Sequence, residues 1–133
     1  MPAKRSVHST SVPEPPPRTW SNCLVFGNQI FVAGMTAQFG AETRGGDSMY
    51  EQSKAVFGKI KALIEEAGGQ MDDVVKVNIF VTDIKRREEV WKARSEFFSG
   101  DFPVSTLVQV AALARPDLLV EIEAVAFVGA AGT

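Results

Sequence analysis

Residues 118–126 read Leu-Leu-Val-Glu-Ile-Glu-Ala-Val-Ala, and this stretch decides the fold. Strands point alternate side chains to opposite faces, so Glu121 and Glu123 should share one face with Leu119, Val125 and Phe127. Two carboxyl groups in so apolar a strand are costly to bury unless they are paired, hydrogen-bonded or protonated. The stretch therefore predicts a strand that carries either a polar network or a reactive site.

A second apolar strand precedes it. Residues 102–110 read Phe-Pro-Val-Ser-Thr-Leu-Val-Gln-Val and predict a strand from Ser105 to about Ala112, with a turn at residues 115–117. The faces of these two strands carry too many apolar side chains to be exposed to water. Exposed apolar patches of that size mark interfaces. We therefore expect a homo-oligomer, with a monomer containing a small second core as the alternative.

Turn residues and periodicity predict the remaining elements. Strands 24–26 and 29–33 flank Gly27-Asn28, a pair that fits a primed two-residue turn. A helix should begin at Ser48, which forms a capping-box pattern with Glu51, and end at Gly68-Gly69. Strand 74–82 follows, with one face formed by Val75, Val77, Ile79 and Val81. A second helix over about 87–98 has one stripe composed of Val90, Trp91, Arg94, Phe97 and Phe98.

The resulting order is β-β-α-β-α-β-β, with hairpins expected at both ends and a mixed sheet that has two helices on one face, an α+β fold. The length of 133 residues fits one domain. We place a Pro-rich, unstructured tail at 1–19, the domain at 20–129 and a C-terminal tail at 130–133. Residues 34–47 are expected to be an irregular, glycine-rich loop, with its glycines acting as a lid or as turns.

Composition excludes several classes of function. The net charge is −2 and the one basic triplet, residues 85–87, is flanked by acids, which argues against a nucleic-acid surface. The single cysteine, Cys23, excludes an internal disulfide and a cysteine-rich metal site. The single histidine, His8, lies in the expected tail, so histidine-based catalysis and zinc binding are not expected. No segment reads as a membrane span or a signal peptide, so we expect a cytoplasmic protein.

Taken together, several segments resemble the Rid family (reactive intermediate deaminase, RidA/YjgF, also called endoribonuclease L-PSP). The resemblance covers residues 20–129. The matching segments are 27–34 (Gly-Asn-Gln-Ile-Phe-Val-Ala-Gly), 64–69 (Ile-Glu-Glu-Ala-Gly-Gly), 75–83 (Val-Lys-Val-Asn-Ile-Phe-Val-Thr-Asp), Phe102-Pro103 and 120–126. It implies a chorismate-mutase-like fold, a homotrimer with a central barrel, and small-molecule clefts between neighbouring subunits.

The resemblance also implies an activity. Deaminating members of the family hydrolyse enamines and imines of 2-keto acids. A glutamate on the last strand positions or activates water, and an arginine two residues after the Phe-Pro proline holds the substrate carboxylate. Glu121 matches the glutamate and is the expected catalytic residue. The arginine position is occupied by Ser105.

The other expected substrate-binding residues follow from the same resemblance. Trp20 corresponds to a family tyrosine, Trp91 falls near the polar helix residue that lines the cleft, and Ser105 and Thr106 can donate hydrogen bonds. Each has a structural alternative: interface anchor for Trp20, core packing for Trp91, and strand hydrogen bonding for the two hydroxyls. Arg94 could replace the missing cation or point outward, and Glu123 is expected to be structural.

Three functions remain open at this point. The first is hydrolysis of a reactive C=N metabolite without a metal or organic cofactor. Its substrate is expected to differ from small 2-imino acids because the arginine is absent. The second is a trimer that binds a small metabolite without turning it over. The third, a ribonuclease or translation inhibitor, is disfavoured by the acidic balance of charge.

Overall fold

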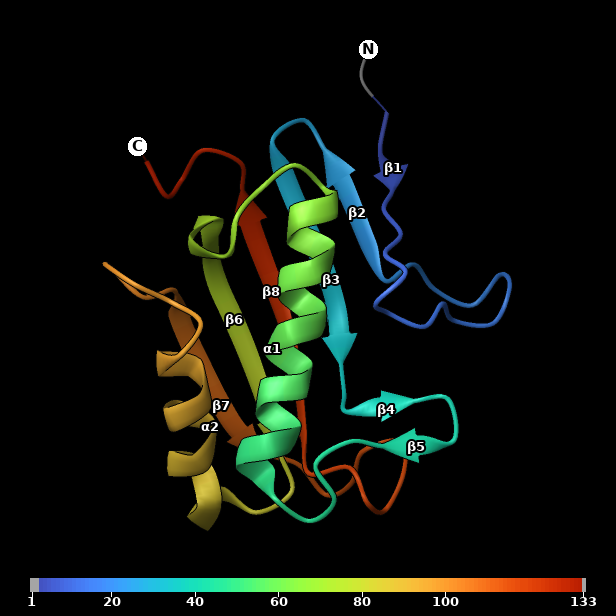
Figure 1. The fold of residues 1–133 in the computed structure, drawn as a ribbon, viewed down its shortest axis with the longest axis vertical. Coiled ribbons are helices and arrows are strands. Elements are labelled where there is room, and N and C mark those ends of the chain that lie inside the picture. The colour runs from blue at the N-terminus through green and yellow to red at the C-terminus, as the bar shows by residue number, and fades with distance from the viewer. Residues whose placement is uncertain (1–2, 133) are drawn as a thin grey trace.

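The computed structural model describes residues 3–132, and a six-stranded mixed sheet runs through it in the order β1-β2-β3-β8-β6-β7 (Figure 1). Its strands are β1 (Arg5–Ser6), β2 (Cys23–Phe26), β3 (Gln29–Met35), β6 (Val74–Val81), β7 (Val104–Gln109) and β8 (Val120–Phe127). Strands β6 and β7 are parallel, and the other neighbouring pairs are antiparallel. The predicted α+β class and mixed sheet are confirmed.

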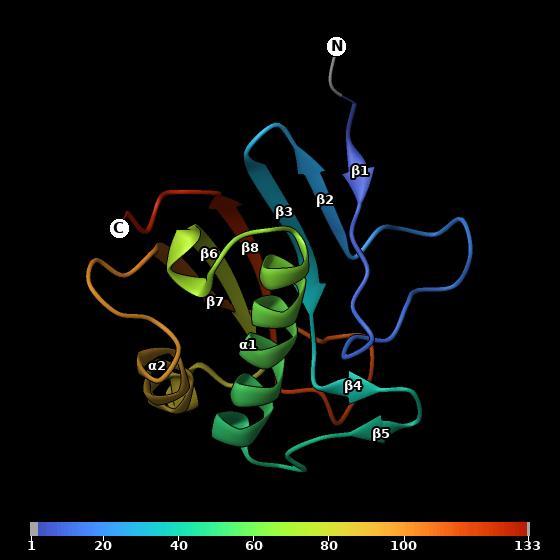
Figure 2. The same cartoon turned by 45° about the horizontal axis from the view of Figure 1, so that its top comes forward.

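Two helices, α1 (Met49–Glu66) and α2 (Arg87–Ser95), cover one face of this sheet, as Figures 1 and 2 show. Helix α1 begins as predicted, because the Ser48 hydroxyl accepts a hydrogen bond from the Glu51 backbone N–H at 3.1 Å. It ends before Gly68, whose φ of +96° favours glycine. Within residues 3–132 no helix is long and apolar enough to cross a membrane.

The hydrophobic core lies between α1 and the sheet. Ile30, Ile79 and Ile122 from three neighbouring strands are fully buried, as is Phe57 from α1. The Phe57 ring packs 5.4 Å from the ring of Phe97 and also contacts Phe98, which joins α1 to the segment after α2. Helix α2 ends at Ser95, earlier than predicted. Phe97 and Phe98 lie after the helix and pack against Phe57 from the turn that follows it.

The predicted C-terminal hairpin is wrong. Strand β8 lies between β3 and β6, while β7 lies at the sheet edge and pairs with β6 alone. Burial explains why β8 lies in the centre of the sheet and β7 lies at its edge. Every second residue of β8, starting at Val120, is buried, so this strand needs the central place under α1, whereas most of β7 is exposed.

Part of the expected N-terminal tail is ordered. Strand β1 pairs with β2, and Val7 and Val12 are buried in the main core. His8 is exposed, and its Nδ1 lies 2.8 Å from the Glu14 carboxylate. The expectation of an unstructured segment is therefore corrected, because two valines supply apolar area that the sheet edge can bury.

Two smaller expectations also need correction. The segment expected to be an irregular loop contains a short hairpin of β4 (Gln38–Phe39) and β5 (Glu42–Thr43). In β6 the pairing with β8 shifts register between Val74 and Lys76, so Val74 is buried and Val75 is not. This bulge leaves the start of the strand at Val74, as predicted, but changes which of the two valines faces the core.

The face of the sheet away from the helices, which we call the open face, is uncovered in the single chain. It carries Phe31, Val104 and Val108, whose exposed fractions are 43%, 67% and 41%. Glu121 and Glu123 lie half-buried on the same face because they alternate with the buried residues of β8. That this apolar face forms an interface between subunits stays a prediction.

Candidate functional site

Glu121 lies against Gly34 of β3. A Cβ atom built on Gly34 would lie 2.9 Å from Cδ and 3.1 Å from Oε2 of Glu121, so only glycine leaves room for the carboxyl group. The register of β3 against β8 shifts between Val32 and Met35, beside this contact. Gly34 was expected in a loop; it instead belongs to a strand, and its missing side chain creates space for the acid.

The electrostatic surroundings of Glu121 favour the protonated form. Burial raises the pKa of this carboxyl group, and the nearby Glu123 carboxylate raises that pKa further. Within the described residues, Glu121 has no ion-pair or hydrogen-bond partner. A half-buried acid without a partner is a stronger base than an ordinary glutamate, which suits a group that accepts a proton from water.

Glu123 has a different environment. Its Oε1 accepts a hydrogen bond from Asn78 Nδ2 at 3.0 Å, in the middle of the open face. Thr106 pairs with Asn78 across the β6–β7 register and therefore shares this face. Asn78 and Glu123 also line a cavity of about 320 Å³ that extends to Phe31. The hydrogen bond supports the structural role expected for Glu123.

Trp20 lies near the other side of Gly34. Both residues line a cavity of about 230 Å³ between the N-terminal segment and β3. The Trp20 indole Nε1 donates to Asn22 Oδ1 at 3.2 Å, and Asn22 in turn donates to the Pro13 carbonyl. Trp20 is 57% exposed, so its ring is available to a ligand or to a neighbouring chain.

The same cavity reaches a buried lysine, which the sequence did not single out. Lys59 of α1 donates from Nζ to the Gln38 carbonyl at 2.6 Å, and its ammonium group lies 4.2 Å from the Phe39 ring centroid. Burial, and then the charge of Arg44, lower the pKa of Lys59 to about 8. The contacts fix the β4–β5 hairpin on α1 and account for the lysine structurally.

Ser105 faces the opposite way from Thr106. It pairs in register with Val77, whose side chain is buried under the helices, so Ser105 points to the helical side of the sheet edge. There its Oγ lies 2.9 Å from Nη1 of Arg94, which donates to it from α2. The two hydroxyls considered together in the sequence are therefore on different faces.

Trp91 does not pack in the core. It is 41% exposed, and the Arg87 guanidinium lies 5.5 Å from its ring centroid. The core-facing residues of α2 are Val90 and Ala93. The apolar stripe predicted for this helix therefore differs from the buried face that the structure shows. Helix α2 ends at Ser95, and the phenylalanines that follow it, Phe97 and Phe98, pack against Phe57 of α1. Trp91 is thus available at the surface, one turn before Arg94.

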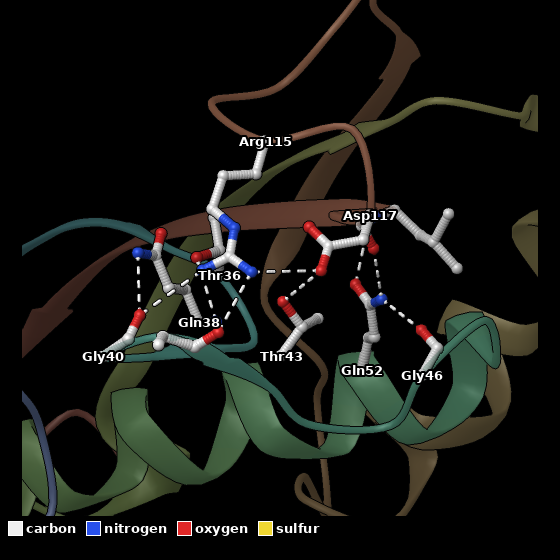
Figure 3. Close-up of polar contacts among 10 residues, drawn as sticks. Thr36, Gln38, Gly40, Thr43, Gly46, Gln52, Arg115 and Asp117 are labelled. Atoms are coloured by element: carbon white, nitrogen blue, oxygen red, sulfur yellow. Dashed lines mark hydrogen bonds and ion pairs between the residues drawn. The ribbon is translucent and has the colours of Figure 1, made fainter.

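A polar network at the start of β8 was also missed. The fully buried Gln52 of α1 donates to the carbonyls of Gly46 and Asp117 at 2.7 and 2.8 Å and accepts from the Leu119 N–H at 2.9 Å (Figure 3). Arg115 and Thr43 both donate to Asp117 Oδ2. The contacts fix the chain just before Glu121. The sequence contained one signal for this network. Gln52 is a polar residue that lies one helical turn before Val56, on the apolar stripe of the helix.

The expected site residues therefore form two groups in one chain. Glu121 of β8 and Trp20 of the N-terminal segment both lie near Gly34 of β3. Ser105 lies at the far edge of the sheet with Arg94, and Trp91 is on the same helix. In the sheet, strand β6 lies between Glu121 on β8 and Ser105 on β7. Within residues 3–132 no three His, Cys, Asp or Glu side chains gather as a metal site would require.

Comparison with known proteins gives a consistent result. The family model described as "Endoribonuclease L-PSP" matches residues 12–128. A RutC family protein of Pyrococcus abyssi is 34% identical over 128 residues, 94% of this chain and 98% of that protein. A 2-iminobutanoate/2-iminopropanoate deaminase of Dermatophagoides farinae is 30% identical, over 94% and 97% of the two chains. A crystal structure of a Pseudomonas aeruginosa protein of unknown function is 38% identical, with a TM-score of 0.86 over 96% and 94% of the chains.

Proposed function

Because the chain belongs to the Rid (YjgF, endoribonuclease L-PSP) family, we propose that it hydrolyses a reactive imine or enamine to a carbonyl compound and ammonia. The reaction takes place in a cleft between subunits of a homotrimer and uses no metal or organic cofactor. The observation that carries the proposal is the unpartnered, half-buried carboxyl group of Glu121 beside Gly34. A similar deaminase of Dermatophagoides farinae supports the reaction class.

The chemistry requires one oriented water molecule and one proton path. Glu121 accepts a proton as the oxygen of water attacks the C=N carbon, and the nitrogen takes up a proton. The resulting carbinolamine loses ammonia and leaves a C=O group, so the sum is imine plus water giving carbonyl plus ammonia. A raised pKa at Glu121 increases its basicity in the ionised state.

The trimer brings the two groups of site residues together. Glu121 lies on a central strand and Ser105 at the β7 edge beside Arg94, so the proposal takes Glu121 and Trp20 of each cleft from one subunit and Ser105 and Trp91 from the next. The exposed apolar residues of the open face and of edge strand β7 provide the area for this association.

The basic triplet gives little support to ribonuclease activity. Arg86 forms an ion pair with Glu89 at 2.8 Å and donates to the Asp47 carbonyl, and Arg87 lies over Trp91. These side chains already have partners within the chain. A phosphate-binding surface needs clustered cations that are free to release counterions.

The test is ammonia release from imines that an amino-acid oxidase generates in situ from several amino acids. We expect Glu121→Gln to lower the rate by about 10²–10⁴-fold, the usual contribution of a general base. Glu123→Gln is the matched control and should keep most of the activity, because Glu123 is held by Asn78. Full activity in the Glu121 variant would overturn the role, and a ligand bound but never turned over would favour the metabolite-binding alternative.

A further inference from the structure

Lys59 of α1 is a buried amine that the proposed hydrolysis does not use. The residue is 6% exposed. Among residues 3–132 it forms no ion pair, and its one hydrogen bond runs from Nζ to the Gln38 carbonyl at 2.6 Å. Its ammonium group also lies 4.2 Å from the centroid of the Phe39 ring. A neutral amine can donate the same hydrogen bond and keep its lone pair, so these contacts leave a nucleophile unused.

The amine lies at a cavity that a small molecule can enter. Lys59 and Gln38 line the cavity of about 230 Å³ between the N-terminal segment and β3. The wall also includes the apolar side chains of Trp20, Met35 and Pro16. Trp20 and Pro16 are exposed, so the cavity opens to the surface beside them. Its size and apolar wall suit a compound of a few heavy atoms.

The charges around Lys59 favour the free amine. Burial, and then the charge of Arg44, lower the pKa of Lys59 to about 8. The Arg44 guanidinium lies 3.5 Å from the centroid of the same Phe39 ring that Lys59 contacts. The acid that lines the cavity, Glu14, is engaged by His8, whose Nδ1 lies 2.8 Å from it. A lysine that is desolvated beside a second cation is activated as a nucleophile toward carbonyl compounds.

We propose that the amine of Lys59 condenses with a small carbonyl compound held in this cavity and forms a Schiff base. The nitrogen attacks the carbonyl carbon, both of its protons pass to the carbonyl oxygen, and that oxygen leaves as water while the C=N bond forms. The step needs no oxidant or reductant, and addition of water reverses it. It gives the chain a second reactive site, which goes beyond the hydrolysis proposed for Glu121 and does not depend on it.

The experiment traps the Schiff base by reduction. Protein is mixed with propanal and sodium cyanoborohydride at neutral pH, and peptide mass spectrometry gives the labelling rate of each lysine. Compared with an amine at the ordinary value of 10.5, a pKa of about 8 makes the fraction of free amine about 300-fold larger. Lower basicity also reduces intrinsic nucleophilicity, as it does for thiols. We therefore expect Lys59 to be labelled about 10- to 30-fold faster than Nα-acetyllysine in the same mixture.

Two controls separate a binding cavity from a lysine that is merely reactive. The labelling rate of Lys59 should saturate as the propanal concentration rises. A bulky aldehyde, 1-naphthaldehyde, should label exposed lysines and leave Lys59 unlabelled, because the ring system is too large to reach the buried amine. Lys59→Met should lose the fast label, and Lys61→Met, at an exposed position of the same helix, should keep it.

The results also separate this inference from the proposed function. Glu121 does not line the cavity, so Glu121→Gln should be labelled at the wild-type rate even when it no longer releases ammonia. Loss of the label in that variant would place both reactions in one site and overturn the inference. Labelling of Lys59 no faster than that of Nα-acetyllysine would overturn it too, as would a rate that rises linearly with propanal or fast labelling by 1-naphthaldehyde.

Discussion

Gly34 and the carboxyl group of Glu121 are in such close contact that a methyl group on Gly34 would lie 2.9 Å from Glu121 Cδ. The contact joins a bulge in β3 to the central strand β8. The contact explains how the Glu121 side chain fits on an apolar strand without an ion-pair or hydrogen-bond partner. Gly34 on the neighbouring strand leaves space for the carboxyl group and has no side chain that could donate a hydrogen bond to it. A substitution at Gly34 therefore tests the position of the acid without changing the acid itself.

We predict that Gly34→Ala displaces the Glu121 carboxyl group. The variant should lose most of its ammonia-releasing activity but little unfolding free energy, because the atoms that the new Cβ meets are the far end of the flexible, half-buried Glu121 side chain. Chemical denaturation and the imine assay measure the two effects. Gly58→Ala is the control, because a Cβ there meets nothing within 4 Å and Gly58 lies within α1. It should stabilise the protein by about 0.5–1 kcal/mol.

The Gln52 network should contribute strongly to stability. Gln52→Leu keeps most of the volume but leaves the Gly46 and Asp117 carbonyls and the Leu119 N–H without their partner. We expect a loss of about 2–4 kcal/mol in urea unfolding, since each stranded buried group costs about 1–3 kcal/mol. Gln38→Leu, which removes only an exposed hydrogen bond to the Gly40 carbonyl, should change stability by less than about 0.5 kcal/mol. Equal effects of the two substitutions would contradict the role of the network.

The raised pKa of Glu121 predicts a pH dependence of stability. In the folded state the carboxyl group binds its proton more tightly than in the unfolded chain, whose ordinary value is 4.5. The folded state therefore holds more protons between that value and the raised pKa, and stability should fall as pH increases through this window. Unfolding of wild type and Glu121→Gln across the acidic range measures the difference. A difference that grows in favour of wild type with increasing pH would contradict the assignment.

Lys59 predicts the opposite trend at alkaline pH. Its folded pKa of about 8 lies below the ordinary value of 10.5, so the unfolded chain binds more protons between them. Wild type should therefore gain stability relative to Lys59→Met as pH rises from about 8 to 10.5, by about 1–3 kcal/mol. Lys61→Met, at an exposed position of α1, is the matched control for replacing a lysine of this helix by methionine. A constant difference for Lys59→Met would refute the depressed pKa.

The exposed edge strand should mediate assembly. Val108→Asp places a charge on a side chain that is 41% exposed in the single chain and lies on the open face. We expect it to shift sedimentation from trimer to monomer at micromolar concentration and to leave the circular dichroism spectrum unchanged, because burying an unpaired charge is costly. Lys61→Glu, on the helical side, should remain trimeric. A monomeric wild type would remove the cleft altogether.

Much of the fold follows from periodicity and turn residues, and the exceptions have physical causes. The first hairpin around Gly27 and helix α1 from Ser48 were predicted because local signals decide them. The neighbours of β8 in the sheet were not predicted, because strand order depends on which strand packs its apolar face under α1 and not on which strand comes next in the chain. The sequence did not predict that residues 5–12 pack against the rest of the fold, because two isolated valines give no periodic signal.

The site was predictable only in part. The alternation in β8 indicated that Glu121 and Glu123 share a face, but their different partners depend on Asn78 and Gly34, which come from other strands. Ser105 and Thr106 were considered together, although strand geometry separates adjacent residues. The contact of Arg94 with Ser105 requires the packing of α2 on β7, which no spacing in the sequence specifies.

Hybrid trimers test most directly whether each cleft is shared between subunits. Glu121→Gln inactivates one half of every cleft, and Ser105→Trp blocks the other half with a bulky ring. When the two inactive proteins are unfolded together and refolded as a 1:1 mixture, about a quarter of the clefts combine an intact half from each neighbour. The account predicts recovery of about a quarter of wild-type ammonia release, with mixed trimers seen by native mass spectrometry. Mixed trimers without any recovered activity would show that one subunit supplies the whole site, and would contradict the account.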